Sequence, residues 1–149
     1  MIVSHASKLA ITALVDLAAR DANQWISADE LCQSIKTDLP FLRQIMNRLA
    51  GEGIVHSRKG RWGGFQIAVP PDQLFLSRVV SAIEGAQLST RCLLNPESCD
   101  GAVPCSLAAT GHTIRKILLN FLNGETIQAV AERGIERMDR LDLDVLDRE

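Results

Sequence analysis

The apolar positions in the first part of the chain follow helical periods. Between residues 4 and 20 they recur at steps of three and four, which predicts an amphipathic helix. Ser27 is a suitable N-cap for a short second helix, with Glu30 at the capping-box position. The expected buried stripe of that helix is Ala28, Leu31, Cys32 and Ile35. Cys32 is therefore interpreted as a small core residue.

A third helix is predicted to begin near Pro40, because proline suits the first turn of a helix. Its apolar stripe consists of Leu42, Ile45, Met46 and Leu49. Arg43, Gln44 and Asn47 stand together on the opposite face, and Gly51 marks the end. This helix therefore pairs one buried face with one polar face.

Two short runs that favour strands follow the third helix. They are IVHS at 54–57 and FQIAVP at 65–70, and RKGRWGG joins them. This pattern predicts a β-hairpin with a basic, glycine-rich tip. Three short helices followed by such a hairpin make a winged helix-turn-helix, so the expected fold class is mainly α with a small β-hairpin wing.

Pro70-Pro71 is the expected boundary between a winged helix-turn-helix region, residues 1–70, and a second region, residues 71–149. Asp72 is placed to cap a helix that ends at Gly85. The expected apolar stripe of this helix is Leu76, Val79, Val80 and Ile83.

A long helix is predicted after Pro104, ending at Asn123-Gly124. Its apolar face is wider than one neighbouring helix would cover, which favours packing against a second copy of the chain. The expected oligomeric state is a homodimer, and the alternative is that the helix packs in the core of a single chain. The face comprises Leu107, Ala108, Gly111, Ile114, Ile117, Leu118, Phe121 and Leu122. A further short helix is expected at 126–133, and a packed or frayed terminal helix beyond it.

Charge separates the two regions. The 149 residues carry a net charge of −2, but residues 1–70 hold eight Lys or Arg against six Asp or Glu, and residues 71–149 hold eight against twelve. Within 40–65, five basic residues face Glu52 alone, a local patch able to meet a polyanion. No apolar run approaches the ~20 residues of a membrane span, and the N-terminus is not a secretory signal. We expect a cytoplasmic protein without a membrane partner.

The third helix and the wing have the chemistry of a DNA reader. Exposed Arg, Gln and Asn supply the donors and acceptors that base edges require in the major groove, and basic residues with glycines in the wing suit phosphates. A solvated polar helix and turn is the alternative. The predicted contacts with double-stranded operator DNA are Pro40, Phe41, Arg43, Gln44, Asn47, Arg58, Lys59, Arg61, Gly63 and Gly64.

Three of the four cysteines fall within CLLNPESCDGAVPC, residues 92–105, at spacing C-x6-C-x5-C. Clustered thiols in a reducing compartment bind metal more often than they form disulfides. A zinc site with three Cys and one His is one possibility, although no CxxC knuckle is present. Redox-active thiols without metal are another. Nothing supplies the orienting group or oxyanion hole of a Cys–His hydrolase, so no enzyme is expected.

The chain resembles the Rrf2 family of bacterial transcriptional regulators over nearly its whole length. The resemblance rests on SKLAITALVDLA, on LPFLRQIMNRLAGEGIVHSRKGRWGGF with its G-x-x-G-G-[YF] wing, and on the cysteines before a long helix. It implies a homodimer that binds operator DNA, most often as a repressor, and carries an iron–sulfur cluster on Cys92, Cys99 and Cys105. The cluster would sense nitric oxide, redox state or iron–sulfur status.

The sequence departs from that family at three places. The first cysteine gap has six residues where five is usual, Arg43 stands where Glu is common, and Lys8 replaces the acidic residue that completes the cluster in nitric-oxide sensors. A protonated lysine offers no lone pair to a metal. The fourth ligand is therefore left between His5, His112, Cys32, an exogenous group and none. His5 lies one turn before Lys8, whereas His112 lies about 10.5 Å along the helix from Cys105.

Overall fold

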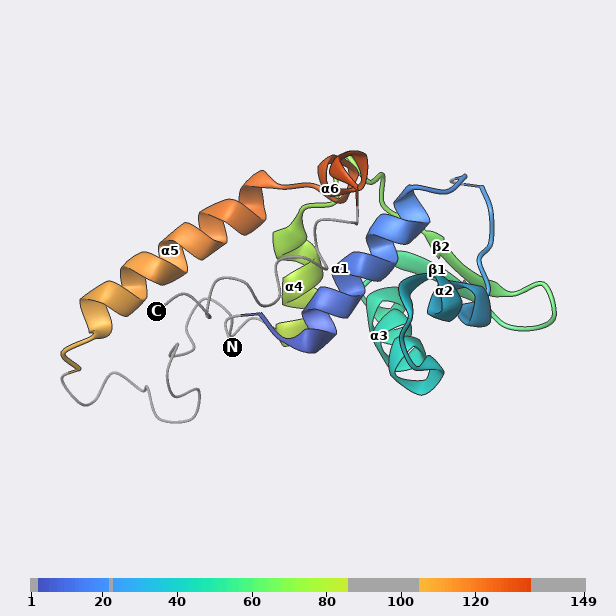
Figure 1. Ribbon diagram of the computed structural model, residues 1–149, viewed down its shortest axis with the longest axis horizontal. Coiled ribbons are helices and arrows are strands. Elements are labelled where there is room, and N and C mark those ends of the chain that lie inside the picture. The colour runs from blue at the N-terminus through green and yellow to red at the C-terminus, as the bar shows by residue number, and fades with distance from the viewer. Residues whose placement is uncertain (1–2, 22, 86–104, 135–149) are drawn as a thin grey trace.

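The computed structural model describes residues 3–21, 23–85 and 105–134, and Figure 1 shows their arrangement. The mainly α fold with a two-stranded antiparallel sheet confirms the predicted winged helix. The elements are α1 (His5–Ala18), α2 (Ala28–Ile35), α3 (Leu39–Gly51), β1 (Val55–Arg58), β2 (Gly64–Ile67), α4 (Leu76–Glu84), α5 (Ala108–Gly124) and α6 (Ile127–Arg133). The predicted helix beyond 134 lies outside the described residues, as does most of the cysteine loop.

Side-chain N-caps set the starts of four helices. Ser27 accepts a hydrogen bond from the Glu30 amide, as predicted. Asp38 accepts one from the Phe41 amide, and Pro40 lies between them in the first turn of α3. Ser4 and Thr126 cap α1 and α6 in the same way. Each such cap stabilises its helix by about 1 kcal/mol. The starts of α2 and α3, the helix-turn-helix pair, are therefore determined by residues close in sequence.

The predicted cap of α4 by Asp72 is wrong. The helix begins at Leu76, after Phe75, and has no side-chain cap. Its first amide, that of Leu76, instead donates to the Glu125 carbonyl at 2.9 Å, beside an antiparallel bridge between Phe75 and Thr126. The connection between α5 and α6 therefore satisfies the start of α4, and no local signal at position 72 is needed.

Helix α1 occupies the middle of the described structure, with α2, α3 and the wing on one side and α4 and α6 on the other (Figure 1). Ala10, Ala13 and Leu14 are fully buried there. One hydrophobic cluster joins them to residues on both sides of Pro70, including Leu49, Val79 and Ile127. The functional division of the chain at Pro70-Pro71 stays a prediction, but α4 and α6 share the core of the winged helix.

A polar clamp fixes α2 against α1. The Arg20 guanidinium donates to Asp16 at 2.8 Å and to Glu30 at 2.6 Å, and the Ser34 hydroxyl also bonds Asp16. Burial lowers the pKa of Arg20, but the hydrogen bonds and charges of the two carboxylates outweigh it and raise that pKa above its ordinary value. The clamp thus stays charged, and it orients the helix that precedes α3.

The wing is a short hairpin extended by a third strand-like contact. Val55 pairs with Ile67 and Arg58 with Gly64, while Ile26 and Phe65 exchange backbone hydrogen bonds at 3.0 and 2.8 Å. Gly64 has φ +144°, and a Cβ there would lie 2.1 Å from the Ile26 carbonyl oxygen. The approach of the Ile26 backbone therefore requires glycine at this position.

No helix within the described ranges is long and apolar enough to cross a membrane. Helix α5 extends away from the remaining elements, and the end that packs against α4 is its C-terminal one (Figure 1).

Candidate nucleic-acid interface

Helix α3 presents the two faces that its sequence predicts. Leu42, Ile45, Met46 and Leu49 are buried in the core. Arg43, Gln44 and Asn47 are exposed on the other side. The nearest ion pair of Arg43 is to Asp29, at 4.0 Å between two exposed side chains, a contact worth about 0–1 kcal/mol. Its guanidinium is thus easily redirected toward a ligand.

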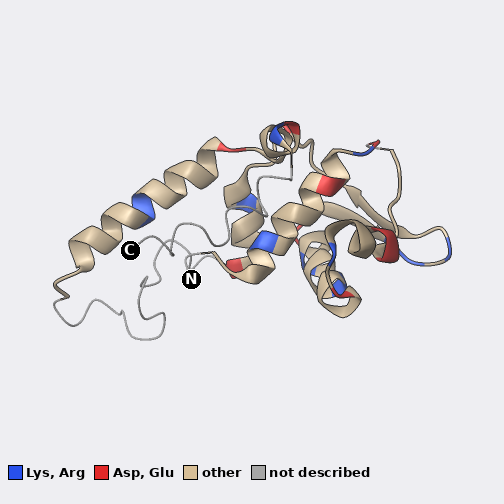
Figure 2. Ribbon diagram, viewed as in Figure 1, with Lys and Arg blue, Asp and Glu red and all other residues tan. Residues whose placement is uncertain are grey.

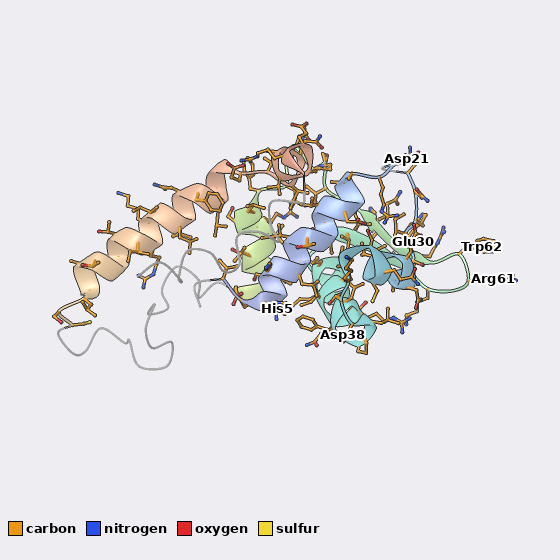
Figure 3. All side chains as sticks on the ribbon, viewed as in Figure 1. His5, Asp21, Glu30, Asp38, Arg61 and Trp62 are labelled. Atoms are coloured by element: carbon orange, nitrogen blue, oxygen red, sulfur yellow. The ribbon has the colours of Figure 1, made fainter. Side chains whose placement is uncertain are left out.

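The first turn of α3 is in contact with the first turn of α1. Pro40 is exposed, whereas Phe41 is half-buried and stacks on the His5 ring, with centroids 5.7 Å apart and planes 7° from parallel. Figure 3 shows His5 at the N-terminal end of α1, on the side of α3. His5 is therefore exposed on one side and in ring contact with α3 on the other. Its predicted role as a fourth ligand from a partner chain stays a prediction.

Basic residues gather at the tip of the wing and on α3, at one end of the molecule (Figure 2). Lys59 and Arg61 are exposed at the tip, and their predicted phosphate contacts stay predictions. Arg58 is exposed as well, so its predicted phosphate contact stays a prediction. Its guanidinium also lies 4.3 Å from the centroid of the Trp25 ring and donates to the Trp62 carbonyl. Arg58 therefore braces the wing, a role that the sequence reading missed because Trp25 belongs to the distant connection between α1 and α2.

The glycine pair Gly63-Gly64, where the tip of the wing enters β2, also serves the fold. A Cβ on Gly63 would lie 2.1 Å from the Arg58 carbonyl oxygen, and one on Gly64 would meet the Ile26 backbone. Their predicted role in bringing backbone close to DNA stays a prediction. The tight approach that is present joins the wing to the rest of its own chain.

The last turn of α4 is anchored to both α3 and α1, which the sequence did not indicate. Arg48 of α3 donates from Nε to the Ala82 carbonyl at 2.8 Å. Glu84 accepts from the Ser7 hydroxyl at 2.6 Å and from the Ser4 amide at 3.1 Å. Ser7 is fully buried, so its hydroxyl depends on this partner. The segment that leads into the cysteine loop is thus bonded to the predicted recognition helix.

Two of the three clustered cysteines, Cys92 and Cys99, lie outside the described residues. Cys105 is exposed just ahead of α5. Cys32 is half-buried against the core, and its thiol donates to the Thr37 carbonyl at 2.6 Å. In the ranges that the structure covers, no group of three or more His, Cys, Asp and Glu residues is placed to hold a metal ion. The remaining candidate, His112, is exposed on α5.

Helix α5 leaves much of its predicted apolar face uncovered. Leu107, Ile114, Ile117 and Phe121 are between 41 and 63% exposed, whereas Leu122 is buried at 2%. A helix that is apolar and exposed over several turns is typical of an association surface. Among the described elements, α4 packs against the C-terminal end of α5.

Comparisons with known proteins agree with this architecture. The model of a family described as Rrf2, iron-dependent transcriptional regulator, matches residues 3–133. The HTH-type transcriptional regulator IscR of Pectobacterium atrosepticum is 25% identical over 146 residues, which cover 97% of this chain and 88% of that protein. Among solved structures, CymR, the global cysteine regulator of B. subtilis, superposes with a TM-score of 0.71 at 20% identity, covering 88% of this chain and 96% of CymR. IscR of T. potens gives a TM-score of 0.69 at 19% identity, covering 91% and 89%.

Proposed function

Because the chain belongs to the Rrf2 family of transcriptional regulators, we propose that it is a homodimeric repressor whose affinity for operator DNA is controlled by an iron–sulfur cluster. Cys92, Cys99 and Cys105 would hold the cluster. The observation that carries the DNA-binding part is α3, which buries one face completely and exposes Arg43, Gln44 and Asn47 on the other, beside a basic wing.

In this proposal α3 enters the major groove and its exposed side chains read base edges. Arg43 suits guanine, whose O6 and N7 accept two hydrogen bonds from one guanidinium. Lys59 and Arg61 meet phosphates, which supply affinity without sequence preference. Arg58 is exposed and meets a phosphate as well, and its contacts with Trp25 and Trp62 also hold the wing in place.

The homodimer is supported by the uncovered face of α5. Burying those side chains against the same face of a second copy removes apolar surface from water and gives a two-fold symmetric pair. Such a pair presents two recognition helices to half-sites about 34–36 Å apart. The opposite end of each chain, with α3 and the wing, stays available for DNA (Figure 2).

The donor set fits an iron–sulfur cluster by its chemistry. Thiolates are the usual ligands of such clusters, Cys105 is exposed beside the loop, and the Cys32 thiol is already bonded elsewhere. A bound cluster would supply iron that reacts with small oxidants or nitric oxide. His5 of a partner chain is the proposed fourth ligand. A cluster-free thiol regulator and a zinc-stabilised protein are the alternatives.

Anaerobic purification followed by an absorption spectrum and metal analysis tests the cofactor. We expect a coloured protein containing iron and sulfide, and Cys92→Ala, Cys99→Ala and Cys105→Ala should each lose the chromophore. Cys32→Ala is the matched control and should keep it, at a small cost in stability. A colourless protein with one zinc per chain would support the zinc alternative, and a metal-free protein with reactive thiols would support the thiol regulator.

Operator binding tests the switch separately from the cofactor. Cluster removal should change the affinity for a specific operator at least tenfold, about 1.4 kcal/mol, while sedimentation shows that the dimer persists. Holo and apo protein must be compared at one salt concentration, because phosphate contacts make affinity salt-dependent. Equal affinities would mean that the cluster does not control DNA binding.

A further inference from the structure

The tip of the wing carries an aromatic residue that the described part of the chain leaves exposed. Trp62 is 78% exposed, more than any other large hydrophobic side chain in the described ranges. Figure 3 shows Trp62 and Arg61 at the far end of the hairpin. Trp62 does not belong to the hydrophobic core, and the ring contact found for it is with the Arg61 guanidinium, 5.7 Å from its centroid.

The backbone that carries Trp62 is nevertheless well held. Arg58 donates to the Trp62 carbonyl while its guanidinium lies over Trp25. The Gly63 amide donates to the Gly60 carbonyl at 2.9 Å, which closes the turn around the tip. The main chain is therefore fixed while the indole ring points outward. Because the backbone is already ordered, a ligand that contacts the ring does not have to order the loop, and binding loses less conformational entropy.

From this geometry we infer that Trp62 contacts the minor groove of DNA beside each half-site and gives the protein a preference for A·T pairs there. The inference rests on the proposed function. Arginine is attracted to narrow, A·T-rich minor grooves, and the Arg61 guanidinium is adjacent to the indole. Large apolar side chains enter or line the minor groove in proteins that bind it. A tryptophan supplies that apolar surface.

The preference for A·T follows from the chemistry of the groove floor. A G·C pair places the guanine N2 amino group in the minor groove, whereas an A·T pair leaves only acceptors there. The guanine N2 amino group would collide with an indole ring that lies against the floor of the minor groove, so the ring fits there only at A·T pairs. Sequence preference at these base pairs would then come from Trp62 rather than from α3.

Fluorescence tests the contact directly. The probe is a duplex that the wild-type protein selects from a random-sequence pool. Trp25 and Trp62 are the two tryptophans of the sequence, so the emission lost in Trp62→Phe belongs to Trp62. Acrylamide quenching of that component should fall at least about twofold when the duplex is bound. Unchanged quenching with the duplex fully bound would overturn the inference.

Binding to modified duplexes tests the preference. Replacing A·T by G·C at the flanking pairs should weaken wild-type binding about tenfold, and inosine·C should restore it, since inosine lacks the N2 amino group. Trp62→Ala should bind the original duplex about tenfold more weakly and no longer distinguish the three versions, while Trp62→Phe should keep most of the preference. Equal discrimination by Trp62→Ala and wild type would overturn the inference.

The same experiments separate this inference from the function on which it rests. A wild-type protein that selects no duplex at all would overturn both. A protein that selects a duplex but shows unchanged Trp62 quenching and unchanged discrimination would overturn the role of Trp62 alone. Because the side chain packs against no core residue, Trp62→Ala should unfold at the wild-type temperature, and this measurement is the control for folding.

Discussion

Arg48 offers the sharpest test of how the recognition helix is held. Its Nε donates to the Ala82 carbonyl at 2.8 Å, and Ala82 lies in the last turn of α4, where carbonyl groups have no partner within the helix. A hydrogen bond from a charged donor is worth about 1.5–3 kcal/mol, and a cation at a helix C-terminus about 0.3–1 kcal/mol. Arg48 is exposed, so water replaces part of this free energy when the bond is lost. We expect Arg48→Met to lower the free energy of unfolding by about 1–2 kcal/mol.

Methionine keeps an unbranched apolar stem and removes the guanidinium, so the measured loss belongs to the anchor. Urea denaturation gives the free energy of unfolding, and an unchanged m-value confirms that the same surface is exposed. Arg43→Met is the matched control on the same helix. Its exposed pair with Asp29 at 4.0 Å should contribute less than about 0.5 kcal/mol, while its operator affinity should fall by about 1–3 kcal/mol if it reads guanine. Equal stability losses in the two variants would refute the anchor.

Three other contacts give further predictions. Gly64→Ala should lower the free energy of unfolding, measured in urea, by about 2–4 kcal/mol. The reason is that φ +144° is strained for alanine and its Cβ would lie 2.1 Å from the Ile26 carbonyl oxygen; wild-type stability would contradict the close approach. Ser7→Ala and Glu84→Ala should show a coupling energy of about 1 kcal/mol in a double-mutant cycle, since they share a 2.6 Å hydrogen bond; additive losses would argue against it. Arg58→Ala should alter the tryptophan emission and cost about 0.5–1 kcal/mol of stability, whereas Lys59→Ala should do neither and should instead reduce the slope of log affinity against log salt by about 1.

Local patterns predicted the elements of this fold because local chemistry determines them. The N-cap of Ser27, the position of Pro40 and the apolar stripe of α3 all act within one or two turns. The G-x-x-G-G-F wing was also recognisable, although two of its glycines, Gly63 and Gly64, are required by the close backbone of Arg58 and Ile26. Asp72 failed as a cap because a carbonyl from the distant residue Glu125 takes its place.

The contacts that hold the candidate site together were beyond the reach of such patterns. Arg48 and Ala82 are 34 positions apart, and Ser7 and Glu84 are 77 apart. An arginine on α3 looks the same in the sequence whether it meets a phosphate or a carbonyl group. The predicted DNA contact of Arg58 stays a prediction for this reason, and the sequence did not indicate that its guanidinium lies over the Trp25 ring. Only the packing of α4 and of the connection before α2 distinguishes these roles.

The anchors of α4 also indicate how a small change in the cysteine loop would reach DNA. Cys92 follows the end of α4 at Glu84 by eight positions, and Cys105 precedes the start of α5 at Ala108 by three. If the proposed cluster controls DNA binding, a change at this loop would act on the last turn of α4, where Ala82 and Glu84 hold α3 and α1, and on the proposed dimer helix. A tenfold change in affinity needs only about 1.4 kcal/mol, the worth of one such hydrogen bond.

These two routes make different predictions for Arg48→Met. If the signal passes through the anchor, the variant has already lost that connection, and holo and apo protein should bind the selected duplex with affinities closer together than in the wild type. The signal could instead pass only through α5, which sets the distance between the two DNA-binding halves of the dimer. In that case the ratio of the holo and apo affinities should stay at the wild-type value, while both affinities fall. Titrating holo and apo forms of the wild type and of Arg48→Met at one salt concentration measures the ratio directly. Because the ratio compares two states of the same variant, a general loss of stability or of DNA contact cancels, and an unchanged ratio would exclude the anchor as the route.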